Sequence, residues 1–344
     1  MSALGTVRDT VSRFTSGSAT IFALLVAVLV AIAVLNPSFV EPPSLMAFLR
    51  AAAPLVVLAI GQYFVIVSGE FDLSVGALVG AQVVIAARLI DGEEANTVPV
   101  MLLMLGFAVV VGLVNGLVTT LLRVPSFITT LGMLLVLNGA IRVWTGGAPT
   151  GALSESFRQW GRSGIDMPVL RQLPWALLIA VVVAVAAVLL MRAPFGRTLV
   201  STGDNDVAAG YAGVTVWRVR TAAFVLSSVL ATLAAVLIGG FAGVTAQVGQ
   251  GLEFVAITAV VLGGVVLGGG KGTVVAAIAG ALTYQAIDRL FTQLDLPSTT
   301  RPVLQGVIII AAVAYAARGR DRATSAPPAP PHRSESERTP VATG

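Results

Sequence analysis

The chain has 344 residues; 56% of them are hydrophobic, only 11% are charged, and the net charge is +4. Too few residues are polar to cover the surface of a water-soluble globule of this size. The composition therefore excludes a soluble protein and indicates an integral membrane protein. The absence of cysteine excludes disulfides, thiolate metal sites and a cysteine nucleophile. The single histidine, His332, stands in a Pro- and Ser-rich stretch, where no metal site is expected.

Two polar stretches flank the apolar part of the chain. Residues 1–18 hold Arg8 and Arg13 among small polar residues and are predicted to be a cytoplasmic N-terminal segment. The apolar run that follows ends at Asn36 and not at a small-residue cleavage site, so it predicts a first span and not a signal peptide. Residues 318–344 are rich in proline and in charges of both signs, which predicts a disordered cytoplasmic tail that begins near anionic lipid headgroups.

Residues 19–317 form the predicted transmembrane domain, because they contain ten apolar segments of about the length that crosses a bilayer. The segments are Ala19–Leu35, Ala51–Val67, Leu73–Ile90, Val98–Leu122, Phe127–Trp144, Pro174–Met191, Thr221–Ala242, Leu252–Leu267, Thr273–Phe291 and Pro302–Ala317. The predicted fold class is therefore all-α, a polytopic membrane protein with about ten transmembrane helices. Leu252–Leu267 is short enough to be re-entrant, which would leave nine crossings.

Small residues recur at four-residue spacing within several of these segments. Gly76 with Gly80 and Gly112 with Gly116 are two such pairs. In lipid, this spacing lets helix backbones approach closely, and it predicts a compact bundle in which some helices are short or discontinuous.

Charge predicts the orientation of the domain. Ten crossings place both termini on one face, and basic residues accumulate there, so the positive-inside rule makes that face cytoplasmic. These residues are Arg8, Arg13, Arg123, Arg192, Arg197, Arg218, Arg220, Lys271, Arg318, Arg320 and Arg322. The opposite face carries Asp91, Glu93 and Glu94 after the third span.

Residues 61–80 contain a break between two apolar runs. Glu70 and Asp72 lie in this break, next to Ser74. Asp72 and Ser74 are residue types that cap a helix N-terminus, where a carboxylate also meets the positive end of the helix dipole. Alternatively, the two carboxylates take a direct part in transport or ion coupling, since ionisable groups at membrane depth are usually functional.

The glycine-rich stretch 262–273 invites comparison with a nucleotide-binding loop. A Walker A loop needs a glycine where Val265 stands, and a serine or threonine directly after the lysine, where Gly272 stands. We therefore expect no ATP site here and predict a tight turn between two helices at the cytoplasmic face.

The longest cytoplasmic connection, residues 192–220, is longer than a simple interhelical loop needs to be. Its Gly203-Asp204-Asn205 turn can cap a short helix at Asp206–Tyr211, and Gly213 can end that helix in the left-handed conformation. A short capped helix between two spans is a feature that a partner protein can bind.

Four ordered motifs carry a resemblance that extends from about Leu35 to Ala317. They are Gly69-Glu70-Phe71-Asp72-Leu73-Ser74-Val75-Gly76; Asn115-Gly116 with Val124-Pro125-Ser126-Phe127-Ile128-Thr129-Thr130-Leu131-Gly132; Gly203-x-Asn205-x-x-Ala208-Ala209-x-x-x-Gly213; and Ala259-Val260-Val261-Leu262-Gly263-Gly264 with Gly269-Gly270-Lys271-Gly272. Together they resemble the permease subunits of ATP-binding-cassette importers for monosaccharides such as ribose, xylose and galactose. Two positions depart from that family's pattern: Glu70 replaces a residue that is more often glycine, and Gly210 stands where a charged residue is common.

The resemblance implies a homodimeric pore in a bacterial plasma membrane. The pore would accept a sugar from an extracytoplasmic sugar-binding protein, and a pair of cytoplasmic ATPases would drive it through the coupling loop 192–220. The coupling residues would be Gly203, Asn205, Asp206, Ala208, Ala209 and Gly213, and the helix-break signature would be Glu70, Asp72, Ser74 and Gly76. The chain itself would hold no cofactor and no metal, perform no covalent chemistry and bind no nucleic acid.

Small polar residues within the spans are the candidates to line the pathway. These are Asn115, Thr129, Thr130 and Asn138, and each could equally bond a neighbouring helix. A nucleoside, an autoinducer or a branched-chain amino acid is the alternative substrate within the importer class. Two other classes remain: an ion-coupled secondary transporter with its proton or sodium site at Glu70 or Asp72, and an intramembrane enzyme built on the same carboxylates.

Overall fold

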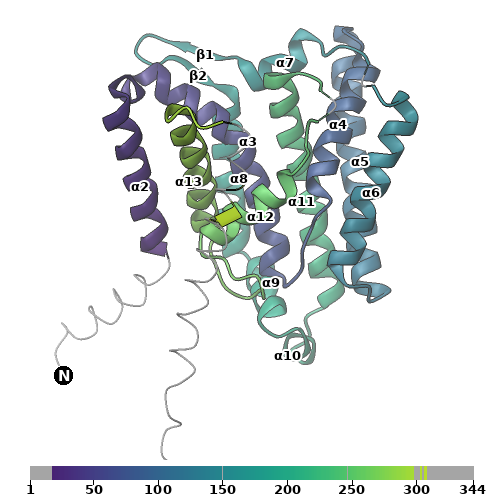
Figure 1. The fold of residues 1–344 in the computed structure, drawn as a ribbon. Coiled ribbons are helices and arrows are strands. Elements are labelled where there is room, and N and C mark those ends of the chain that lie inside the picture. Colours follow the sequence, from purple (N-terminus) through teal and green to yellow (C-terminus); the bar gives the residue numbers. More distant parts are fainter. Residues whose placement is uncertain (1–17, 149, 246, 298–302, 304–305, 308–344) are drawn as a thin grey trace, which may run out of the picture.

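The computed structural model describes residues 18–148, 150–245, 247–297, 303 and 306–307 (Figure 1). The N-terminal segment up to residue 17, nearly all of the predicted tenth span and the tail 318–344 lie outside the described residues. In chain order the elements are α2 (Ser18–Leu35), the 3-10 helix η1 (Pro37–Val40), α3 (Pro42–Val67), α4 (Val75–Ile90), α5 (Glu94–Leu121), α6 (Ser126–Thr145), α7 (Glu155–Arg162), β1 (Gly164–Met167), β2 (Arg171–Pro174), α8 (Trp175–Arg192), α9 (Pro194–Asp204), α10 (Asp206–Tyr211), α11 (Val216–Ala242), α12 (Leu252–Leu262) and α13 (Val274–Gln293).

The chain is a polytopic, all-α membrane protein. The other nine predicted spans coincide with helices, and six helices of the described chain are long and apolar enough to cross a membrane. Three shorter apolar helices, α2, α4 and α12, complete the set. The main boundary error lies at α3, which begins at Pro42 and not at Ala51. N–H groups in the first turn of a helix have no partner within the helix, so proline, which has no N–H, is favoured there. The two prolines at positions 42 and 43 therefore favour a helix start earlier than hydropathy indicated.

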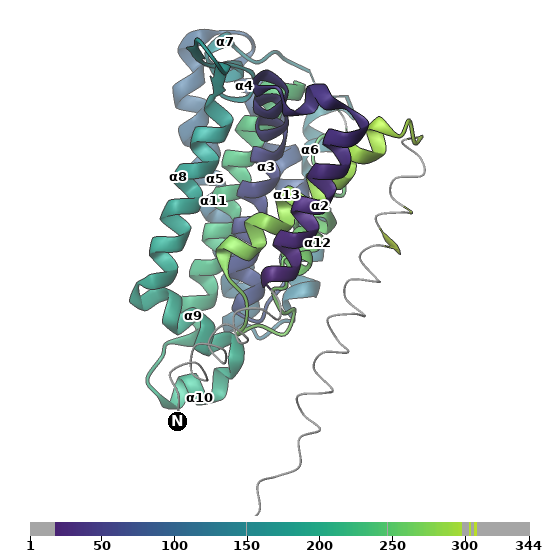
Figure 2. The same ribbon diagram turned by 90° about the vertical axis from the view of Figure 1, so that its left-hand side faces the viewer.

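The helices α3 and α11 form the centre of the bundle. Figure 1 shows α2 and α13 packed on one side of this pair and α4, α5 and α6 on the other, and Figure 2 shows the same bundle from the side. A Cβ added to Gly61 of α3 would lie 3.2 Å from the Ser227 Cα of α11. The pair Gly112 and Gly116 brings α5 against the same helix, because added Cβ atoms there would each lie 2.6 Å from an α11 Cα atom. The small residues therefore set helix distances, as lipid-embedded packing requires.

Both central helices are followed by a break and a short helix. At one end of the bundle, α3 ends at Val67, and residues 68–74 run inward without helical structure to the start of α4. At the opposite end, α11 stops at Ala242, and residues 243–245 and 247–251 belong to the connection to α12, which starts inside the bundle. The eleven residues of α12 span only about 16 Å. That is about half of the hydrocarbon thickness of a membrane, so α12 does not cross it alone. The expectation that some helices are discontinuous is confirmed.

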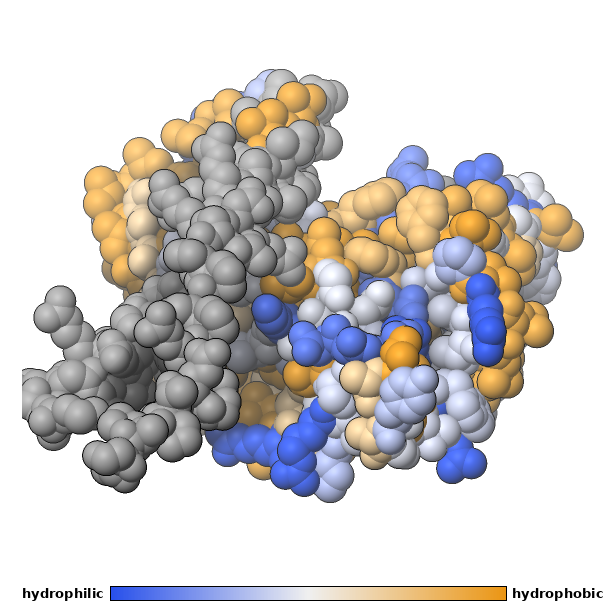
Figure 3. Space-filling model, turned by 90° about the horizontal axis from the view of Figure 1, so that it is seen from below, coloured by the Kyte–Doolittle hydropathy of each residue, from blue (hydrophilic) through white to orange (hydrophobic). Residues whose placement is uncertain are grey.

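The two ends of the bundle carry different structures. Helices α9 and α10 lie at one end, where hydrophilic side chains gather when the molecule is viewed from below (Figures 1 and 3). The opposite end carries α7 and the antiparallel hairpin β1–β2, in which Gly164 pairs with Pro174. Sequence patterns indicated neither element. Helix α7 is capped from two directions: Ser154 Oγ accepts the Phe157 N–H at 3.2 Å, and the Glu94 carboxylate of α5 accepts the Glu155 N–H at 2.8 Å.

Candidate functional site

A hydrogen-bonded cluster closes the break between α3 and α4. The Asp72 carboxylate is fully buried and accepts three hydrogen bonds: from Ser74 N at 2.9 Å, from Ser74 Oγ at 2.6 Å and from Ser227 Oγ of α11 at 3.0 Å. Asn115 of α5 donates from Nδ2 to Ser74 Oγ at 2.9 Å. This cluster ties the start of α4 to α5 and α11. Asp72 accepts the N–H of Ser74, the residue directly before α4, as the capping interpretation expects, whereas the Ser74 side chain caps no N–H of the helix.

The unpaired backbone of the break is satisfied from a second direction. Ser126 Oγ accepts the Phe71 N–H at 3.1 Å, and Thr130 Oγ1 accepts the Leu73 N–H at 3.0 Å, both from α6. The Gln62 side chain of α3 donates to the Asp72 carbonyl at 2.8 Å. Irregular backbone at membrane depth needs such partners, because no water is present to bond it.

The starts of α4 and α12 meet inside the bundle. A Cβ added to Gly76 would lie 2.6 Å from the Gly249 carbonyl oxygen and closer still to the Glu253 carboxylate, so only glycine fits there. The Glu253 side chain is buried in the first turn of α12, where the helix dipole favours a carboxylate. Because residues 68–74 and 247–251 reach this contact from opposite ends of the bundle, the N-terminal ends of α4 and α12 meet, which is the geometry that places solute sites near the middle of many transporters.

Glu70 belongs to an ion cluster at the α9–α10 end of the molecule. Arg220 of α11 lies with Nε 3.1 Å from Glu70 Oε1 and Nη2 3.3 Å from Asp206 Oδ2. The same Nε donates to the Ser68 carbonyl at 3.3 Å. Side-chain exposure is 19% for Arg220 and 13% for Glu70 but 48% for Asp206. One guanidinium therefore connects the end of α3, the break and the first residue of α10.

We expect Arg220→Gln to loosen α10 and to destabilise the bundle by about 1–3 kcal/mol, because Glu70 would keep a largely buried charge without its partner. Since the chain has no cysteine, spin labels can be attached at Tyr211→Cys on α10 and Leu122→Cys after α5, two exposed positions. The distance distribution between the labels should broaden.

Arg218→Gln is the matched control for Arg220→Gln, because Arg218 loses the same charge on the same helix but packs over the Trp217 ring, 5.2 Å from its centroid. Equal distributions in the two variants would contradict the link through Arg220.

The predicted coupling helix is present as α10. Asn205 caps it by accepting the Ala208 N–H at 2.9 Å, and Gly213 follows it at φ +87°, in the left-handed region that favours glycine. Tyr211 is 91% exposed, and Ala208 is exposed as well. Ala209 is buried against the body of the protein, so its contacts are intramolecular. The surface that a partner can reach therefore consists of the other face of this helix.

Three chain segments meet at glycines beside α10. The Val67 carbonyl at the end of α3 accepts the Gly270 N–H at 2.9 Å. Gly203, near the end of α9, lies directly against both groups. Gly269, at φ +82°, approaches Gly69 so closely that an added Cβ would lie 2.8 Å from its Cα. The glycine-rich stretch thus forms the expected tight turn, and it packs against the end of α9.

The four predicted pathway residues have different surroundings. Asn115 and Thr130 belong to the hydrogen-bonded cluster at the break. Thr129 is half-buried, and Asn138 is exposed on α6. A role of any of these in the pathway stays a prediction; for the first two, the observed contacts are those of bonds between neighbouring helices.

Sequence patterns missed Arg220 as a partner of the break and Glu253 as a buried group. The sequence shows Arg220 only as one of several positive charges near this end of the span. Glu253 is a lone carboxylate in an apolar run, and that is the signal by which it could be found.

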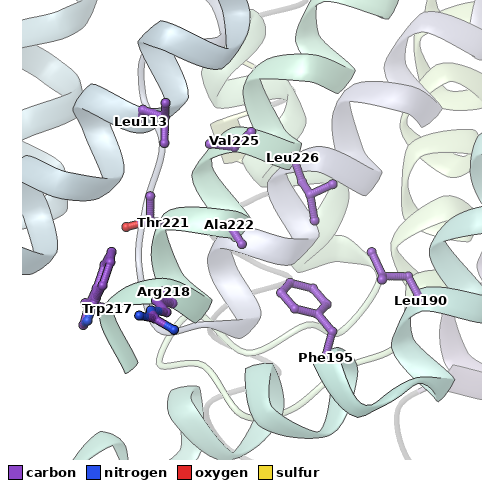
Figure 4. Close-up of a pocket in the computed structure, with 9 residues that line it drawn as sticks. All are labelled: Leu113, Leu190, Phe195, Trp217, Arg218, Thr221, Ala222, Val225 and Leu226. Carbon is purple, nitrogen blue, oxygen red and sulfur yellow. The ribbon is translucent and has the colours of Figure 1, made fainter. Parts of the chain in front are cut away.

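A groove of about 540 Å³ opens between α5, α8, α9 and α11 (Figure 4). Its lining residues are Leu113, Leu190, Phe195, Trp217, Arg218, Thr221, Ala222, Val225 and Leu226. The walls are almost wholly apolar, whereas a sugar needs hydrogen-bonding groups for its hydroxyls. This groove therefore lacks the chemistry of a sugar site.

Comparison with known proteins is consistent with this architecture. The ribose import permease protein of Bacillus subtilis (strain 168) is 33% identical over 215 residues, 60% of this chain and 63% of the relative. The corresponding protein of Escherichia coli (strain K12) is 31% identical over 218 residues, 62% of this chain and 67% of the relative. The autoinducer 2 import system permease protein of Enterobacter sp. (strain 638) is 32% identical over 219 residues, 63% of this chain and 62% of the relative. The alignments thus span about two thirds of the curated relatives, or slightly less.

No solved structure matches the chain. Residues 44–313 match one protein family, and this region contains the breaks, α10 and the glycine junction. The chain therefore belongs to the family described as branched-chain amino acid transport system / permease component.

Proposed function

We propose that the chain is the transmembrane permease subunit of an ATP-driven importer for a monosaccharide. Two copies form the pathway, a cytoplasmic ATPase pair binds at α10, and an extracytoplasmic binding protein delivers the sugar to the opposite end. The chain holds no cofactor and hydrolyses no ATP itself. Family membership supports the transport role, and the ribose import permeases among its relatives support the sugar class.

The observation that carries this proposal is the placement of α10. It is a short, capped and largely exposed helix at one end of the bundle, and it is tied by Arg220 to the break that leads to α4. A partner that moves α10 has a direct route into the spans. ATP binding to the partner can then shift the chain between two conformations, provided that the two states bind the partner differently.

In this proposal the α9–α10 end faces the cytoplasm, with both termini on that side. Arg192, Arg197 and Lys271 lie at this end. The opposite end also carries arginines, among them Arg162, which pairs with Glu155. Because basic residues lie at both ends, they support this orientation less strongly than the exposed helix α10 does.

Autoinducer 2 is the second candidate substrate, because permeases for this compound are among the relatives at nearly the same identity. Branched-chain amino acids are a candidate substrate only because the family description names them. Ion coupling at Asp72 has less support, because its carboxylate already accepts three hydrogen bonds within the bundle.

The proposal is tested by reconstituting the chain in vesicles with the ATPase and the binding protein that co-purify with it. We expect uptake of D-ribose, or of another sugar that the binding protein retains, only when all three components and ATP are present. Ala208→Glu, on the exposed face of α10, should reduce ATPase co-purification while membrane insertion stays normal. Uptake by the chain alone under an ion gradient would refute the importer.

A further inference from the structure

One exposed, non-helical stretch lies at bilayer depth. Gly249 packs on the first two turns of α4, where added Cβ atoms on Gly249 and on Gly80 would collide with the facing backbone. With a helix rise of about 1.5 Å per residue, that contact lies roughly 15–21 Å below the end of α4 at Ile90. Figure 1 shows α12, which starts directly after this stretch, at mid-height of the bundle. Residues 247–251 are therefore within the hydrocarbon layer.

Polar groups are exposed at this depth. Gln247 and Gln250 are exposed, and Phe254 in the first turn of α12 is 62% exposed. The backbone around them forms turns, with Gly249 and Gly251 both at positive φ. Irregular backbone and side-chain amides do not face lipid, because each unbonded polar group there costs several kcal/mol. This surface must therefore contact water or another polypeptide.

We propose that Gln247, Gln250 and Phe254 line the solute pathway and bind an uncharged, polyhydroxylated solute. This inference rests on the proposed importer function and assigns three residues to its solute pathway. A primary amide both donates and accepts hydrogen bonds, as a sugar hydroxyl does, and an aromatic ring packs against the C–H face of a sugar. The Glu253 carboxylate, between Gln250 and Phe254 in the chain, is buried against Gly76. The exposed side chains therefore offer no charged partner for the ammonium and carboxylate groups of an amino acid.

Water access is tested with single cysteines in the complete importer in membrane vesicles. The Gln250→Cys variant should react with a charged, lipid-insoluble methanethiosulfonate, and D-ribose turnover should change the rate of that reaction. Val182→Cys is the matched control, because this α8 residue is 67% exposed in a purely apolar surrounding. If the Gln250→Cys variant is as unreactive as the Val182→Cys variant, lipid or protein covers the surface and the inference is overturned.

Solute recognition is tested with Gln250→Leu, which keeps the approximate size but removes the amide. We expect ribose import to fall about tenfold, the effect of losing one hydrogen bond to the bound solute, while ATPase assembly stays normal. Gln250→Asn, which keeps the amide, should recover part of the rate. Unchanged import in Gln250→Leu, or inhibition of wild-type import by leucine and not by sugars, would overturn the assignment.

The two proposals fail in different ways. A wild-type complex that imports nothing refutes the importer, whereas cysteine reactivity needs no transport and still decides whether residues 247–254 face water.

Discussion

Alanine at Gly203 is expected to abolish coupling between the ATPase and the spans and to destabilise the bundle by more than about 3 kcal/mol. The Val67 carbonyl and the Gly270 N–H form a 2.9 Å hydrogen bond next to Gly203. An added methyl carbon would lie 2.6 Å from the Gly270 nitrogen and closer still to the Val67 oxygen. Both atoms belong to the backbone, so no side chain can rotate away. Helix α9 must therefore separate from α3, and the junction beside α10 opens.

Gly210→Ala is the matched control for this prediction. Gly210 lies within α10, and an added Cβ there meets nothing within 4 Å. Alanine should stabilise this helix by roughly 0.5–1 kcal/mol, because it loses less backbone entropy than glycine does. Thermal unfolding of both purified variants and their ATP-driven sugar uptake check the pair of expectations. Normal uptake by Gly203→Ala would mean that the three-segment junction does not transmit the movement of α10.

Removing the Asp72 carboxylate is the second change with a large expected effect. In Asp72→Ala, the Ser74 N–H and the Ser74 and Ser227 hydroxyls lose their buried acceptor. Each unsatisfied buried group costs about 1–3 kcal/mol, so we expect the three groups together to lower the free energy of unfolding by at least about 3 kcal/mol. The start of α4 would also detach from α11, so import should be lost together with stability.

Two variants separate this capping role from a role in ion coupling. Asp72→Asn keeps one acceptor oxygen, and Ser227 can reverse its hydroxyl toward the new amide, so the loss of stability should be much smaller than for alanine. Ser227→Ala removes a single bond and should cost about 1–2 kcal/mol. Unfolding by heat and the rate of ATP-driven import are measured for each. If Asp72→Asn is fully stable but transports nothing, the carboxylate has a function beyond capping.

The coupling helix shows what local sequence can predict. The N-cap at Asn205, the helix Asp206–Tyr211 and the positive φ at Gly213 are all found where the sequence indicated them. Each of these depends on hydrogen bonds or backbone preferences within a few residues. The spans were predictable for a similar reason, because crossing a bilayer demands a continuous apolar run.

The site at the break could be predicted only in part. The sequence marked Asp72 and Ser74 as capping residues, but it could not show that Ser227, 155 positions away, completes the cluster. It also left Glu70 unexplained, and the explanation is Arg220 on a distant helix. Such partners are chosen by helix packing, and a single sequence carries no information about which of many polar residues will be brought together.

The sequence by itself determined the membrane class, the apolar spans, the break after α3, the short capped helix Asp206–Tyr211 and the family motifs, because each follows from composition or from interactions between near neighbours. Only the tertiary structure decided that α12 is a half-helix meeting α4 at Gly76 and Gly249, and that polar side chains are exposed beside that contact. The physical reason is that a polar group within the bilayer has no water to bond and needs a partner in the protein. The packing of α3 against α11 decides which group becomes that partner.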